Sequence, residues 1–248
     1  MLIPNFQNLA KKIETLITEE YNANNDPDEF PWEMRMEIKL TTDNSICFRP
    51  RRLAFSEKEK LREILEELQK NKIIRPSNSP FASLTVLVKK KTGDIRLCVD
   101  YQELYKVTVK DNFSSPLIND HLDRLREKKY FSKLDLRNEF HHVQMAEESI
   151  KYTSLVTSME QYEYLKMPFG STNAPRFFQM YLSRIFQKLL KENRMLMYLH
   201  DLLIATQTVE EYLEILREVF YLFRRHKFNK FDGINVRFYT QESRTWFI

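Results

Sequence analysis

The chain has 248 residues, of which 42% are apolar, and this length and composition predict a packed globular protein of one large or two modest domains. The formal net charge is +4, and the residues from Arg224 onward supply all of it. The net charge of residues 1–223 is therefore zero, so this part of the chain has no overall positive field that would attract nucleic acid. Three glycines, Gly93, Gly170 and Gly233, are too few for a glycine-rich phosphate loop.

The N-terminal half predicts a helix followed by a β-hairpin. Ser56 and Glu59 form a capping box for a helix that runs to about residue 71 with one apolar face. Residues 84–88 and 95–99 alternate apolar and polar on either side of a Thr-Gly turn, which is typical of a hairpin. Four basic residues gather on it: Lys89, Lys90, Lys91 and Arg96.

The central part predicts a short helix over residues 117–125, then a strand over 130–136 that contains Asp135 near its end. Two short strands are expected near 152–157 and 162–166. A helix then opens at Pro175, and we expect its aromatic residues, Phe177, Phe178, Tyr181 and Phe186, to be core residues rather than a base-stacking platform.

The C-terminal part predicts a hairpin over residues 195–206, with Tyr198, Leu199, His200 and Asp201 at its tip. Thr208 and Glu211 form a second capping box, which starts a helix to about residue 223. After Arg225 the periodicity fades.

No secretory signal and no apolar run approaching ~20 residues is visible in the sequence. The two cysteines, Cys47 and Cys98, have no metal-type spacing, which suits a reducing compartment. We therefore expect an intracellular protein, in the cytoplasm or the nucleus, without a membrane span.

Carboxylates are the strongest chemical feature of the sequence. Asp135 and Asp201 come from two separate strand elements, and a βαββ-like core would gather them at one edge. Two Mg²⁺ ions roughly 3.5 to 4 Å apart can hold an attacking hydroxyl and a triphosphate in line, and they need such shared oxygen ligands. Structural readings stay open, because Asp135 could cap a strand and the His200–Asp201 pair could be a turn without chemistry. His141 and His142 are adjacent, so on a strand they would face opposite sides, and we do not expect them to share an ion.

Five ordered segments resemble successive blocks of the reverse transcriptase of gypsy-like LTR retrotransposons. They are IIRPSNSPFAS at 73–83, VLVKKK at 86–91, RLCVDY at 96–101, YFSKLDL at 130–136 and MPFGSTNAP at 167–175. The resemblance covers about residues 35–225. Any one segment would be a weak signal, whereas five in the family's order are a strong one.

The resemblance implies an α+β right-hand polymerase fold, in which an antiparallel palm sheet packs on helices and the thumb is absent or vestigial. It divides the chain into an N-terminal linker or helix (1–44), reverse transcriptase fingers and palm (45–225) and a divergent basic tail (226–248). Fingers are expected at about 45–109 and 144–173, and palm at about 110–143 and 174–225. The implied activity is RNA-directed DNA synthesis with Mg²⁺, deoxynucleoside triphosphates and an RNA or DNA primer-template.

Carried over residue by residue, the resemblance assigns roles to seven positions. Asp135 and Asp201 match catalytic, metal-binding aspartates, and the Leu136 backbone carbonyl can complete a metal shell. Phe140 matches the aromatic gate that excludes a ribose 2′-hydroxyl. The remaining nucleotide-binding positions are Lys90 and Arg96, which match cations that grip the triphosphate, and Gly170, in the turn near the template and incoming base.

His200 departs from the family, which has a metal-binding aspartate at this position and a Tyr-x-Asp-Asp motif over 198–201. Imidazole suits Zn²⁺ or Cu²⁺ far better than Mg²⁺, and one negative charge is lost. Glu139, Ser171 and the Glu160-Gln161 turn also differ from the family pattern. We therefore expect weakened Mg²⁺ binding and catalysis that is lost or severely reduced.

Three functional hypotheses remain open on the sequence alone. The chain is a working polymerase, a non-catalytic nucleic-acid-binding domain that uses residues 89–96 and the basic tail, or an inert or protein-binding remnant.

Overall fold

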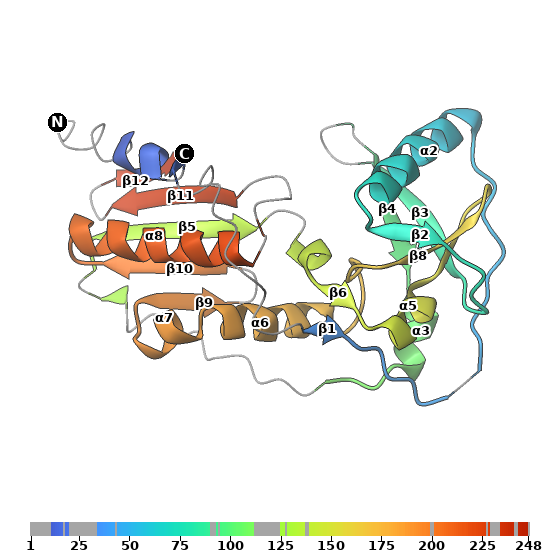
Figure 1. The fold of residues 1–248 in the computed structure, drawn as a ribbon. Coiled ribbons are helices and arrows are strands. Elements are labelled where there is room, and N and C mark those ends of the chain that lie inside the picture. The colour runs from blue at the N-terminus through green and yellow to red at the C-terminus, as the bar shows by residue number, and fades with distance from the viewer. Residues whose placement is uncertain are drawn as a thin grey trace. The chain divides into compact units, whose positions relative to one another are not determined.

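A computed structural model gives the fold, which is shown in Figure 1. It describes residues 11–16, 18–19, 34–42, 44–89, 93, 95–111, 125–126, 128–136, 139–198, 201–226, 228, 234–240 and 243–247. The chain divides into two compact units: unit 1 comprises residues 1–33, 113–139 and 178–248, and unit 2 comprises 34–112 and 140–177. Helices and largely antiparallel sheets occur in both, so the α+β prediction is confirmed.

Unit 1 is built on a five-stranded antiparallel sheet in the order β12-β11-β5-β10-β9. The strands are β5 (Tyr130–Leu136), β9 (Met195–Tyr198), β10 (Asp201–Thr206), β11 (Ile234–Thr240) and β12 (Ser243–Phe247). In β5 the side chains of Ser132, Leu134 and Leu136 are buried, and the residues between them are partly exposed. This alternation gives the sheet a buried face and a more open face.

Helices cover the buried face of the unit 1 sheet. They are α6 (Ala174–Ile185), which starts in unit 2, α7 (Gln187–Lys191) and α8 (Val209–Arg225). Six residues of α8 are buried: Tyr212, Ile215, Leu216, Val219, Phe220 and Phe223. The Tyr212 hydroxyl lies 2.7 Å from the Ser132 hydroxyl of β5, which joins this helix to the central strand. The rings of Phe186 and Phe223 pack edge to face with centroids 5.2 Å apart, so α8 also contacts the N-cap residue of α7.

Unit 2 contains a second five-stranded sheet in the order β2-β8-β7-β3-β4. Its strands are β2 (Ile74–Pro76), β3 (Ser83–Lys89), β4 (Ile95–Asp100), β7 (Leu155–Val156) and β8 (Gln161–Tyr164). Helix α2 (Phe55–Lys70) buries Leu61 and Leu65 in a cluster with residues of β2, β7 and β8. The shorter elements are β1 (Arg35–Met36), α3 (Gln102–Val107), η1 (Glu139–His142), β6 (Gln144–Met145), α5 (Glu147–Ile150) and η2 (Lys151–Thr153).

Several expected elements are confirmed. The β3–β4 hairpin forms, although Ser83 and Thr85 are its buried β3 residues and Leu84 and Val86 are only partly buried. Strand β5 has the expected bounds, and Thr208 caps α8 by accepting a hydrogen bond from the Glu211 N–H. The expected helix over 117–125 lies outside the described residues except for residue 125. No helix among the described residues is both long and apolar enough to span a bilayer, and both cysteines are free thiols.

Three local expectations were wrong or incomplete. Helix α2 begins at Phe55 with Ala54 as its N-cap, because the Glu57 carboxylate accepts the Ala54 N–H at 3.0 Å and leaves Ser56 inside the first turn. The adjacent histidines lie in the short 3₁₀ helix η1 rather than on a strand. Residues 234–247, where no element was expected, form β11 and β12, and β11 pairs with β5 along its whole length.

Candidate active site

The two aspartates predicted to converge lie directly opposite each other in unit 1. Asp201 is the antiparallel partner of Asp135, and it is also the partner of Tyr198 on the other side. Directly opposed residues in an antiparallel pair have Cα atoms about 4.5–5.5 Å apart and point to the same face. The predicted convergence is confirmed, and Tyr198, Asp201 and Asp135 form one row across three strands.

The row lies on the face of the sheet opposite the helices. Asp135 stands between the buried residues Leu134 and Leu136, and Asp201 precedes the buried residue Leu202. Because side chains alternate along a strand, both carboxylates are directed away from α8. The two carboxylates therefore lie on the partly exposed face of the sheet.

A lysine that the sequence analysis did not single out joins this row. The Lys133 ammonium nitrogen lies 2.7 Å from Oδ2 of Asp201, and the two side chains are 36% and 43% exposed. Lys133 stands two residues before Asp135, hence on the same face of β5. That two-residue spacing within a strand was the available signal, and it does not by itself identify Asp201 as the partner.

Two predicted site residues, Lys90 and His200, lie outside the described residues. Leu136 is buried as the last residue of β5, and the role of its carbonyl stays a prediction. Within the described parts of the chain, no group of three or more His, Cys, Asp or Glu side chains could hold a metal ion. Asp135 and Asp201 thus supply a pair of carboxylates and not a complete metal shell.

In unit 2, the predicted nucleotide-binding residues Arg96 and Phe140 meet at one ring, that of Phe169. The Arg96 guanidinium lies 4.7 Å from the Phe169 ring centroid, and the Phe140 ring lies 4.9 Å from it. Phe140 is buried, whereas Arg96 is exposed. Phe169 was not among the predicted site residues, although it lies inside the MPFGSTNAP segment at 167–175.

The buried imidazole of His141 packs against the same ring. It packs edge-on against Phe169 at 5.1 Å and stacks near Tyr164 at 6.2 Å. Burial, and then the nearby charges of Arg96 and Lys166, lower the pKa of His141 from 6.5 to about 4. This imidazole is therefore neutral at neutral pH and acts as an aromatic packing group.

Gly170 occupies a turn that needs glycine. Its φ of +87° lies in the left-handed region, and a Cβ there would come within 3.4 Å of the Tyr105 hydroxyl oxygen. The turn places backbone, rather than a side chain, directly after Phe169.

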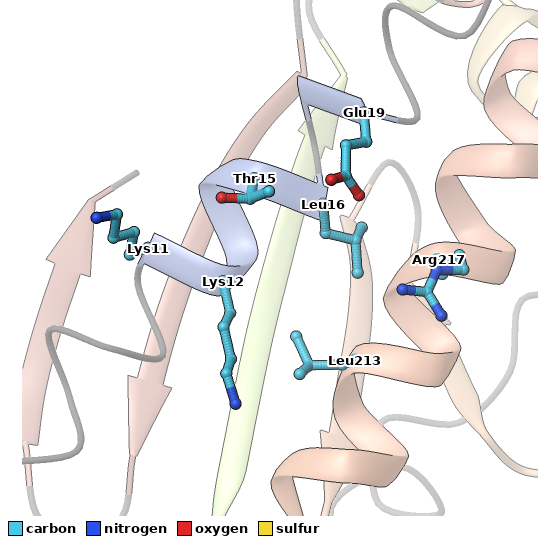
Figure 2. A pocket seen from close by; sticks show the side chains of 7 residues that line it. All are labelled: Lys11, Lys12, Thr15, Leu16, Glu19, Leu213 and Arg217. Carbon is cyan, nitrogen blue, oxygen red and sulfur yellow. The ribbon is translucent and has the colours of Figure 1, made fainter.

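A cavity of about 540 Å³ lies elsewhere in unit 1, and Figure 2 shows the side chains that line it. It lies between helical residues near the N-terminus and α8 and is lined by Lys11, Lys12, Thr15, Leu16, Glu19, Leu213 and Arg217. Since α8 covers the face opposite the carboxylates, this cavity is separate from the aspartate row.

Comparisons with known proteins agree with this geometry. Residues 88–230 match the family described as reverse transcriptase (RNA-dependent DNA polymerase). The chain is 37% identical over 161 residues to the "Retrovirus-related Pol polyprotein from transposon 297" of Drosophila melanogaster. The aligned region covers 63% of the chain and 15% of that protein. It is 32% identical over 192 residues to the polyprotein from transposon 412 of the same fly, covering 75% of the chain and 15% of that protein.

Solved structures show the same fold. The foamy viral protease-reverse transcriptase in complex with dsDNA aligns with a TM-score of 0.73 and 21% identity, over 89% of this chain and 46% of that one. The same viral protein in complex with an RNA/DNA hybrid aligns with a TM-score of 0.69 and 19% identity, over 90% of this chain and 32% of that one.

The family match covers more than half of the chain, so this protein belongs to the reverse transcriptase family. The predicted resemblance to retrotransposon Pol polyproteins and the predicted polymerase fold are confirmed. The chain spans about 15% of the length of the transposon polyproteins.

Proposed function

We propose that the chain is the fingers and palm of a retrotransposon-type RNA-directed DNA polymerase whose catalysis is lost or severely reduced. In this proposal unit 1 is the palm and unit 2 belongs to the fingers. The observation that carries the polymerase assignment is the direct cross-strand pairing of Asp135 with Asp201 in a chain of this family. The expected loss of catalysis rests on the histidine at position 200 of the sequence.

The donor chemistry at this row fits Mg²⁺. Carboxylate oxygens are its preferred protein ligands, and two of them on adjacent strands can reach one small cation. Asp135 and Asp201 would hold the ion, with the Leu136 carbonyl as a further oxygen donor. Bound Mg²⁺ would supply charge stabilisation at the phosphates and activate the primer hydroxyl.

Unit 2 would bind the incoming deoxynucleoside triphosphate. Arg96 offers a planar guanidinium that can pair with phosphate oxygens in two-point contacts, and Lys90 would add a point charge. Phe140, held by its contact with Phe169, would be the ring that excludes a 2′-hydroxyl, and Gly170 would let backbone approach the base.

His200 is the residue to which we assign the loss of catalysis. The family aspartate supplies an oxygen ligand and a negative charge, and histidine supplies neither to Mg²⁺. If metal stabilisation falls by about 4 kcal/mol, the rate falls by about a thousandfold, since each ~1.4 kcal/mol is a factor of ten.

The test compares the parent chain with His200→Asp by Mg²⁺ calorimetry and single-nucleotide primer extension. We expect weak Mg²⁺ binding and almost no extension by the parent, and tighter Mg²⁺ binding by His200→Asp. Extension need not recover fully, because Glu139 also departs from the family. A parent chain that extends the primer as well as an active His200→Asp chain would refute the assigned loss of catalysis, and no Mg²⁺ binding by either would refute the metal site.

A second candidate function is nucleic-acid binding without catalysis. The foamy viral relatives of the same fold carry dsDNA and an RNA/DNA hybrid in their structures, which supports a nucleic-acid partner for this chain. If several phosphates are contacted, affinity for a primer-template should fall steeply between roughly 50 and 200 mM salt, and Arg96→Ala should weaken it. Absence of salt-dependent binding to the primer-template would instead favour an inert or protein-binding remnant.

A further inference from the structure

The ion pair between Lys133 and Asp201 places a positive charge where the proposed metal would bind. The ammonium nitrogen is 2.7 Å from Oδ2, which is direct contact with one of the oxygens that a cation would use. Lys133 reaches Asp201 diagonally, because its own cross-strand partner on β10 is Leu203. The contact therefore depends on the sheet register and not on sequence neighbourhood.

We propose that Lys133 is an internal cation that competes with Mg²⁺ for Asp201 and sets the metal affinity of this site. The two aspartates and the lysine together carry a net charge of −1, whereas the two carboxylates alone would carry −2. Binding of a divalent ion must displace the ammonium group from Oδ2 or tolerate it nearby. This inference rests on the proposed metal site and names a residue that tunes it.

The size of the effect follows from distance and charge. A Mg²⁺ ion sits about 2.1 Å from its oxygen ligands, so an ammonium group in contact with the same carboxylate lies within roughly 5 Å of the ion. Both side chains are more than a third exposed, so a water-like dielectric applies to the repulsion. At that distance and dielectric, removal of the lysine charge should tighten Mg²⁺ binding by about tenfold.

The experiment measures Mg²⁺ binding alone, by calorimetry, on the full chain. Lys133→Gln removes the charge, and Lys133→Arg retains it. Lys129→Gln is the matched control, because Lys129 is an exposed lysine just before the same strand and its removal changes the net charge equally at the far end of β5. Asp135→Asn tests whether the measured ion binds at the aspartate row at all.

We expect Lys133→Gln to bind Mg²⁺ about tenfold more tightly than the parent, with Lys133→Arg and Lys129→Gln close to the parent. Loss of the exposed ion pair should change folding stability little, which urea unfolding of each variant checks. If Lys133→Gln binds no more tightly while Asp135→Asn abolishes binding, the metal site stands and the proposal for Lys133 is overturned. If Lys129→Gln tightens binding as much as Lys133→Gln, the effect is one of net charge and the proposal is again overturned. If no chain binds Mg²⁺, the proposed metal site itself fails, and the inference fails with it.

Discussion

Replacing Asp135 with asparagine should stabilise the metal-free protein while weakening its metal binding. Asp135 and Asp201 are directly opposed across two strands, and like charges in such positions destabilise a sheet. At a separation of about 5 Å in a water-like dielectric the repulsion is roughly 0.8 kcal/mol, and Lys133 offsets part of it through Asp201. We therefore expect Asp135→Asn to be about 0.5 kcal/mol more stable than the parent at low salt.

Urea unfolding followed by tryptophan fluorescence measures this difference. The chain has two tryptophans, Trp32 and Trp246, and Trp246 belongs to β12 of the same sheet, so a Trp32→Phe background reports on unit 1. The advantage of Asp135→Asn should shrink in 1 M salt, where charges are screened beyond about 3 Å. Adding Mg²⁺ should reverse the order, because a ligand stabilises the state that binds it.

Asp111→Asn is the control, since it removes one exposed carboxylate from unit 2 and leaves the aspartate row intact. It should leave the unfolding of unit 1 unchanged. A metal-free Asp135→Asn chain that is less stable than the parent at low salt would show that Asp135 has a structural role, and the reasoning from charge repulsion would be wrong.

Three further predictions concern the packing that supports the site. Ser132→Ala and Tyr212→Phe should each cost about 1–3 kcal/mol, because each removes the buried contact between the two hydroxyls. In a urea double-mutant cycle the double variant should cost less than the sum of the single variants, and additive costs would contradict the contact. The pKa of His141 is about 4 in the folded chain and 6.5 in the unfolded chain, so as the pH falls the unfolded chain binds this proton first. Unit 2 should therefore lose about 2 kcal/mol of stability between pH 7 and pH 5. Urea titrations should show that His141→Phe lacks this part of the pH dependence, and an unchanged slope would contradict it. Deleting residues 234–248 should leave β5 as a sheet edge and promote aggregation, measurable by light scattering, and a monodisperse truncated chain would contradict the pairing of β11 with β5.

The sequence was sufficient for elements whose signal is local. The bounds of β5, the β3–β4 hairpin and the Thr208 cap of α8 follow from alternation, turn residues and capping chemistry within a few positions. The expected βαββ-like core predicted that Asp135 and Asp201 converge, which the register of β5 and β10 confirms. The local prediction was wrong at the start of α2, where the Glu57 carboxylate accepts the Ala54 N–H and makes Ala54, rather than Ser56, the N-cap.

Tertiary structure decided everything that depends on which strands and rings meet. The Lys133–Asp201 contact needs a particular cross-strand register, and the gathering of Arg96, Phe140 and His141 around Phe169 needs three separate segments to come together. The pairing of β11 with β5 joins residues about a hundred positions apart, and nothing in the composition of 234–240 identifies its partner. Periodicity fixes which face of an element a residue occupies, because backbone geometry sets it locally, whereas the partner across that face is fixed by packing between segments distant in the chain.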